Sequence, residues 1–121
     1  MKITTFNPTI VSSKSEDIIK LFEALGFEKR HHNVEVEDRP SYRLKDANGF
    51  YVDVVQNDEA TQDHTVIRMN VDNFDEAHEI LLAHGFKDGP RLLDKKSAKS
   101  TGMISPSGFV IGLVEHKKNH D

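Results

Sequence analysis

The chain has 121 residues, of which 36% are apolar and 30% charged, so we expect one compact domain, residues 1–121, without a second core. No apolar stretch approaches the roughly 20 residues that cross a bilayer, and the first residues lack a signal peptide's apolar segment, so we expect a cytoplasmic protein with no membrane partner. The absence of Cys excludes disulfides and thiolate chemistry, and a net charge of -4 argues against a nucleic-acid partner.

The first half of the chain, about residues 3–56, predicts a strand, a helix and three further strands. A short strand at 8–11 leads into an amphipathic helix, for which Ser13 is the expected N-cap with Glu16 three positions later. Gly26 suits the left-handed end of this helix. The three strands are expected at 28–37, at 41–45 and, after the Asn48-Gly49 turn, at 50–55.

The second half, about residues 64–116, follows a polar linker at 57–63 and predicts the same order of elements. Its first strand is expected at 67–70, and its helix is capped by Asn73 with Glu76 and ends at Gly85. The remaining segments are a short strand near Phe86, a lysine-rich loop at 91–100, a strand at 101–104, a strand at 109–114 after the Ser107-Gly108 turn, and a polar tail at 117–121.

The two halves share one sequence offset. The glycines that end the helices are separated by 85 − 26 = 59 residues, and the glycines of the late turns by 108 − 49 = 59. This common offset indicates a tandem duplication.

The repeated strand, helix and three-strand pattern resembles the vicinal oxygen chelate superfamily of glyoxalases, bleomycin-resistance proteins and extradiol dioxygenases. The resemblance lies in Leu25-Gly26-Phe27, which closes the first helix, and in Asn70 to Ala77, which enters the second repeat. It implies an α+β fold in which two tandem βαβββ modules form a curved mixed sheet around a cavity, with the helices on the outer face. It also implies a homodimer, because such sheets leave an edge or face that a second copy covers.

Active members of that superfamily generally bind one divalent metal through the first and last strands of each module. The offset assigns these positions to Asn7 and Val66 (66 − 7 = 59) and to Asp53 and Gly112 (112 − 53 = 59). Val66 and Gly112 have no side-chain donor, whereas a catalytic ion takes three or more protein ligands. We therefore expect no metal and no other cofactor; the alternative is one divalent metal held by a shifted set that includes His64 and Asp53.

The alternation of side chains along the strands predicts which residues face the cavity. Arg68 has two readings: an ion pair with Asp53, or a clamp on a ligand's carboxylate or phosphate. The expected ligand-binding residues are Asn7, Thr9, Tyr51, Asp53, His64, Arg68 and Asn70.

The resulting functional hypothesis is a metal-free protein that binds a small molecule, similar in plan to bleomycin-resistance proteins that sequester a drug or metabolite. The alternative is a metal-dependent lyase, isomerase or dioxygenase of the same superfamily. A third reading is a regulatory or partner-binding module whose cavity is closed by side chains. No nucleophile with an adjacent base can be assembled from spacing, so the sequence assigns no catalytic residue and no substrate.

Overall fold

The computed structural model describes residues 1–30, 40–94 and 98–116, and the chain divides into two compact units. The N-terminal unit is Asn7–Val66, and the C-terminal unit is Met1–Phe6 together with Ile67–Asp121. Strands β1 (Ile3–Ser12) and β5 (His64–Val71) each contribute residues to both units. The boundaries between the units therefore fall inside the first strand of each predicted repeat.

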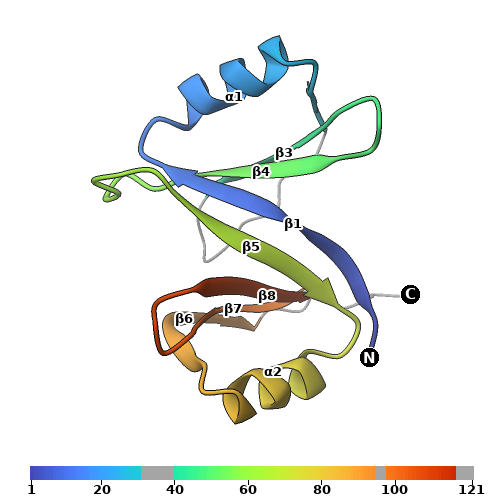
Figure 1. Ribbon diagram of the computed structural model, residues 1–121, viewed down its shortest axis with the longest axis vertical. Helices are drawn as coiled ribbons and strands as arrows, with labels where there is room; N and C mark the ends of the chain where they lie inside the picture. The colour runs from blue at the N-terminus through green and yellow to red at the C-terminus, as the bar shows by residue number, and fades with distance from the viewer. Residues whose placement is uncertain (31–39, 95–97, 117–121) are drawn as a thin grey trace. The chain divides into compact units, whose positions relative to one another are not determined.

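In the N-terminal unit one helix covers one face of a set of strands in the order β2-β3-β4-β1. Its elements are α1 (Ser15–Ala24), β2 (Glu28–Lys29), β3 (Ser41–Lys45) and β4 (Tyr51–Gln56). β1 is parallel to β4, and the other pairs are antiparallel. α1 packs against β4, as Figure 1 shows.

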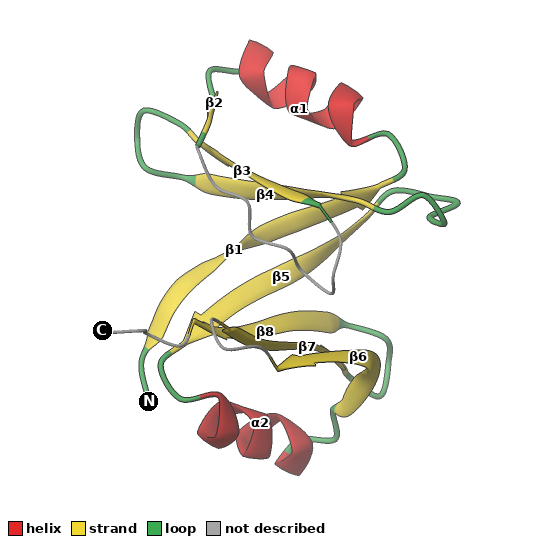
Figure 2. Ribbon diagram, turned by 180° about the vertical axis from the view of Figure 1, so that it is seen from behind, coloured by secondary structure: helices red, strands yellow, loops and turns green. Residues whose placement is uncertain are grey.

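The C-terminal unit repeats this plan, with strands in the order β5-β8-β7-β6. Its elements are α2 (Phe74–Ala83), β6 (Lys87–Asp94), β7 (Ala98–Ile104) and β8 (Val110–His116). β5 is parallel to β8, β8 is antiparallel to β7, and β7 is antiparallel to β6. α2 packs against β7 and β8, and Figure 2 shows this unit from behind.

The offset of 59 residues holds in the structure. Adding 59 to the bounds of α1, 15 and 24, returns the bounds of α2, 74 and 83. Each helix is followed by a glycine with positive φ, 106° at Gly26 and 90° at Gly85. The N–H of the next residue donates back to a carbonyl of the helix, from Phe27 to Phe22 and from Phe86 to Leu81. The predicted α+β class and the two tandem βαβββ modules are confirmed.

The predicted cap of the first helix is wrong, whereas that of the second is confirmed. The N-cap of α1 is Lys14, which makes no side-chain cap bond, rather than Ser13. Gln56, the last residue of β4, satisfies the start of α1 instead. Its Oε1 accepts from the Ser15 N–H at 3.0 Å and from the Ser15 hydroxyl at 2.6 Å. At α2 the Asn73 side chain accepts from the Glu76 N–H at 3.1 Å, as predicted.

Two of the predicted middle segments need correction. The lysine-rich loop expected at 91–100 is largely strand, since β6 extends to Asp94 and β7 begins at Ala98. Antiparallel pairing of these strands overrides the loop-like composition. The strand expected at 28–37 is described only as Glu28–Lys29, and positions 31–39 lie outside the described residues.

Strand alternation separates a core face from a polar face in each unit. In the N-terminal unit, Ile19 of α1 packs on Leu44, Val52 and Val54. In the C-terminal unit, Phe74 and Ala77 of α2 pack on Met69, Met103, Ile111 and Leu113. The face away from the helix is thereby left to the polar residues predicted for ligand binding. Among the described residues no helix is long and apolar enough to span a membrane.

Candidate functional site

The polar face of the N-terminal unit is centred on Asp53, which is fully buried in the middle of β4. The strand register places Thr9 of β1 beside it on one side and Arg43 of β3 on the other. A buried carboxylate is costly unless a cation and hydrogen-bond donors compensate it. The neighbours of Asp53 supply both.

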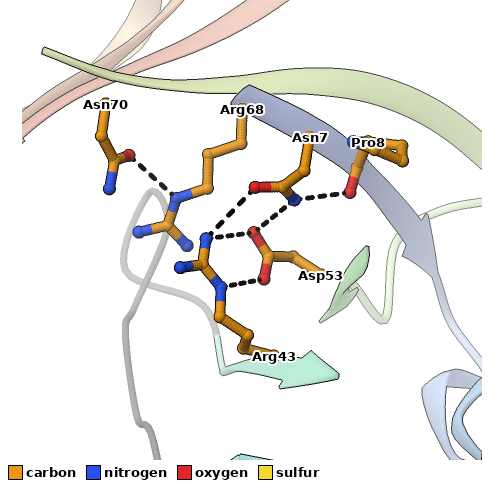
Figure 3. Close-up of polar contacts among 6 residues, drawn as sticks. All are labelled: Asn7, Pro8, Arg43, Asp53, Arg68 and Asn70. Atoms are coloured by element: carbon orange, nitrogen blue, oxygen red, sulfur yellow. Dashed lines mark hydrogen bonds and ion pairs between the residues drawn. The ribbon is translucent and has the colours of Figure 1, made fainter. Parts of the chain in front are cut away.

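Arg43 binds the carboxylate of Asp53 with two donors. Its Nε donates to Asp53 Oδ1 at 2.9 Å, and its Nη2 donates to Asp53 Oδ2 at 3.2 Å (Figure 3). Two parallel bonds of this kind fix the guanidinium in orientation as well as in position. The Arg43 side chain is 15% exposed, so this ion pair is largely removed from solvent.

Asn7 closes the arrangement by contacting both partners of the ion pair. Its Oδ1 accepts from Arg43 Nη2 at 3.2 Å, and its Nδ2 donates to Asp53 Oδ2 at 3.0 Å. The same Nδ2 donates to the Pro8 carbonyl at 2.9 Å (Figure 3). The amide therefore turns its oxygen toward the cation and its nitrogen toward the anion.

Arg43 is the site residue that the sequence analysis missed. In the structure β3 and β4 pair residues whose numbers sum to 96, which sets Arg43 opposite Asp53. A two-residue turn at Asn48-Gly49 would give a sum of 97 and would set Leu44 there, so the turn alone did not predict this pair. The available signal was strand alternation, because it places Arg43 on the face opposite the core residue Leu44.

Tyr51 lies next to two cations on the same strand pair. The guanidinium carbon of Arg43 is 4.9 Å from the Tyr51 ring centroid, and Lys45 Nζ is 5.3 Å from it. Both separations are within the range of cation–π attraction. The Lys45 ammonium makes no ion pair with any other residue in the described part of the chain.

Thr9 was predicted to face the ligand, and its side chain is 1% exposed beside Asp53. Its hydroxyl has no hydrogen-bond partner among the described residues. Buried hydroxyls are nearly always hydrogen-bonded, so the Thr9 hydroxyl adds an available donor and acceptor next to Asp53.

In the C-terminal unit, Arg68 and Asn70 lie on the polar face of β5. Arg68 is 2% exposed, and its Nε donates to Asn70 Oδ1 at 3.1 Å (Figure 3). Gly112 of β8 is paired with Arg68 in the strand register. A Cβ built on Gly112 would meet only the Ile67 carbonyl oxygen, at an ordinary 3.7 Å, so local packing does not exclude a side chain there.

The four positions to which the resemblance assigned a metal carry side chains that do not fit a divalent ion. Val66 and Gly112 have no donor atom. Asp53 directs both carboxylate oxygens, and Asn7 its amide oxygen, at the guanidinium of Arg43. His64 is exposed, with its Nδ1 3.4 Å from the Gln62 carbonyl, and no three His, Asp or Glu residues gather as a metal site within the described residues.

A separate hollow of about 360 Å³ lies on the helix side of the C-terminal unit. Lys99, expected in the lysine-rich loop, belongs to β7, and its Nζ is 3.1 Å from Asp75 and 4.8 Å from the Phe74 ring centroid. Ion pairing and ring contact thus hold Lys99 on the face that α2 covers. The residues lining the hollow are Phe74, Asp75, His78, Asp88, Leu92 and Lys99.

Comparisons by sequence find neither a matching family model nor a matching curated protein. Solved structures do match. Methylmalonyl-CoA epimerase from Mycobacterium tuberculosis superposes with a TM-score of 0.68 at 12% identity, over 96% of this chain and 90% of that one. A glyoxalase/bleomycin resistance protein/dioxygenase superfamily member from Vibrio splendidus 12B01 gives 0.61 at 14% identity, over 94% and 99%.

The chain has the vicinal oxygen chelate fold. Glyoxalase I from Zea mays also superposes, with a TM-score of 0.66 at 12% identity over 98% of this chain, and this chain spans only 45% of the maize protein. The predicted resemblance is therefore confirmed for the fold. At such identities the activities of these neighbours cannot be transferred to this chain. The function of this chain has to be inferred from its own site residues.

Proposed function

We propose that this vicinal oxygen chelate protein binds a small organic molecule without a metal ion, on the polar face of its N-terminal unit. The observation that carries the proposal is the pairing of Arg43 with Asp53 and Asn7. Asp53 and Asn7 stand at positions to which the resemblance assigned a metal ligand. The guanidinium of Arg43 already binds both carboxylate oxygens of Asp53 and the amide oxygen of Asn7.

The chemistry of the pair supports this choice. A divalent ion at Asp53 would have to displace a guanidinium held by two hydrogen bonds to the carboxylate and one to Asn7. Arg cannot lose its proton in a protein, so the guanidinium would remain charged beside the incoming ion. Repulsion between the two cations in a site shielded from solvent opposes metal binding.

The same residues offer recognition rather than proton transfer. Arg43 is a permanent donor, Asn7 both donates and accepts, and Tyr51 presents an aromatic face. None of the three supplies a general base that works near neutral pH. We therefore favour binding over the metal-dependent lyase, isomerase or dioxygenase alternative.

Elemental analysis of the protein, purified without chelators, tests the metal-free part of this proposal. We expect a metal-to-chain ratio near zero and no change in melting temperature on addition of Mn²⁺, Ni²⁺ or Zn²⁺, because specific binding to the folded state would raise it. A ratio near one that Asp53→Ala abolishes would favour the enzyme. Asp63→Ala, at an exposed carboxylate outside the site, is the matched control.

A fragment screen by protein-observed NMR tests the binding part. We expect hits that shift the amides of Asn7, Arg43 and Tyr51 more than those of the α1 residues on the other face. A screen without hits on this face would favour a module whose cavity is closed by side chains.

A further inference from the structure

We propose that Arg43, Lys45 and Tyr51 form a subsite for an oxyanion, the carboxylate or phosphate group of a small organic ligand. This inference rests on the proposed small-molecule binding and adds the chemical class of the ligand. The three side chains come from the paired strands β3 and β4.

The first argument is that Arg43 has donors left over. Its Nε and Nη2 bind Asp53 and Asn7, whereas its Nη1 donates to none of the described residues. Two N–H groups of Nη1 remain on a guanidinium that its other bonds already hold in place. An anion that accepts from Nη1 would bind a cation that needs little further ordering, which favours affinity.

The second argument is the charge balance of this face. Asp53 neutralises Arg43, but Lys45 has no ion pair among the described residues. Residues two apart on a strand face the same way and lie about 6.6 Å apart along it, so Lys45 and Arg43 point to one side of the sheet. Glu28 lies opposite Lys45 in the β2–β3 register but makes no ion pair with it, so within the described residues the Lys45 ammonium is not engaged by a carboxylate on the face where we place the ligand.

The third argument is the position of Tyr51 between these cations. Its ring centroid is 4.9 Å from the Arg43 guanidinium carbon and 5.3 Å from Lys45 Nζ. The ring thus positions both cations while leaving their hydrogen-bond donors available. Nearby on the same polar face, the Thr9 hydroxyl is buried without a partner among the described residues.

The fourth argument is that the duplicated half lacks all three residues. The offset of 59 relates Arg43 to Gly102, Lys45 to Ile104 and Tyr51 to Val110. Those positions still form paired strands, so the scaffold does not need a cation or an aromatic ring there. The offset also replaces Asp53 by Gly112, which leaves Gly102 no carboxylate to compensate. The presence of Lys45 and Tyr51 in one repeat only is therefore the part that favours recognition over folding.

The experiment compares three small probes with the wild-type protein at low salt: benzoate, phenyl phosphate and the uncharged amide benzamide. NMR spectra report the shifts of the Arg43 side-chain Nε–H and of the Tyr51 amide. We expect both anions to shift these signals and to bind at least about fivefold more tightly than benzamide, because charge-assisted hydrogen bonds are the stronger ones. The tighter of the two anions identifies the preferred group.

Lys45→Met is the variant that removes the ammonium group while keeping the apolar stem. We expect it to lower affinity for the bound anion about fivefold or more, and Lys45→Arg to restore most of it. Lys29→Met is the matched control, since Lys29 Nζ lies 5.6 Å from the ring centroid of Tyr42, which packs on the helix side. It should leave anion binding unchanged.

The remaining outcomes separate this subsite from the proposed function. Equal binding of benzoate and benzamide, unaffected by Lys45→Met, overturns the subsite while small-molecule binding stands. Absence of shifts with all three probes, alongside fragment hits elsewhere on the polar face, also overturns the subsite alone. A stoichiometric metal, or no ligand of any kind, overturns the proposed function itself.

Discussion

Arg43 and Asp53 face each other across the antiparallel pair β3–β4, with the guanidinium bonded to both oxygens of a fully buried carboxylate. Asp53 occupies one of the positions at which the resemblance to the vicinal oxygen chelate superfamily implied a metal ligand. A cation supplied by the protein's own β3 thus engages that carboxylate.

Breaking the pair from the arginine side should destabilise the protein. We expect Arg43→Met to lower the free energy of unfolding by about 2–3 kcal/mol, because it removes two charge-assisted bonds from a buried carboxylate. Asp53→Leu combined with Arg43→Met should recover much of this loss. Urea unfolding of the two single variants and the double variant gives the coupling energy, and additive effects would contradict a strong pair.

The close approach of β6 and β7 should make Gly89 intolerant of any side chain. A Cβ at Gly89 would lie 2.6 Å from the Gly102 carbonyl oxygen, so the two backbones would have to move apart. We expect Gly89→Ala to cost about 1–3 kcal/mol in urea unfolding. Gly112→Ala is the control, with its nearest contact at 3.7 Å, and an equal loss in both variants would refute the steric explanation.

Gln56 should stabilise the start of α1 through the bonds that replace a helix cap. Its Nε2 donates to the Ser13 carbonyl at 2.7 Å, in addition to the bonds that Oε1 accepts from Ser15. We expect Gln56→Leu to lower stability by about 2 kcal/mol, more than the roughly 1 kcal/mol expected for Asn73→Ala at the conventional cap of α2. Hydrogen exchange should show the first turn of α1 opening selectively; unchanged protection there would argue against this role.

The homodimer remains a prediction that rests on the family resemblance. Light scattering coupled to size exclusion, at tens of micromolar chain, should give about twice the monomer mass of 13.7 kDa. Dilution series at two salt concentrations would separate a specific dimer from weak charge-driven association. A mass of one chain throughout would refute the prediction.

Local signals in the sequence were sufficient for the repeat, for the ends of its two helices and for the facing of the strand at 51–55. Glycines at 26 and 85, each followed by Phe, mark the helix ends because only glycine adopts positive φ there without strain. Alternation along 51–55 separated the core residues Val52 and Val54 from Asp53, since successive strand residues face opposite sides. These features depend on near neighbours, so composition and periodicity reveal them.

Only the tertiary structure decided which distant residues bind one another. The Ser13 cap was wrong because Gln56, 41 residues from Ser15, competes for the same backbone groups. The loop expected at 91–100 became strand because pairing with a neighbour outweighs local preference. Nothing in the segment Ser41–Lys45 by itself marks Arg43 as a site residue. The strand register places its guanidinium against the buried carboxylate of Asp53. This charge pairing between distant residues determines what the site can bind.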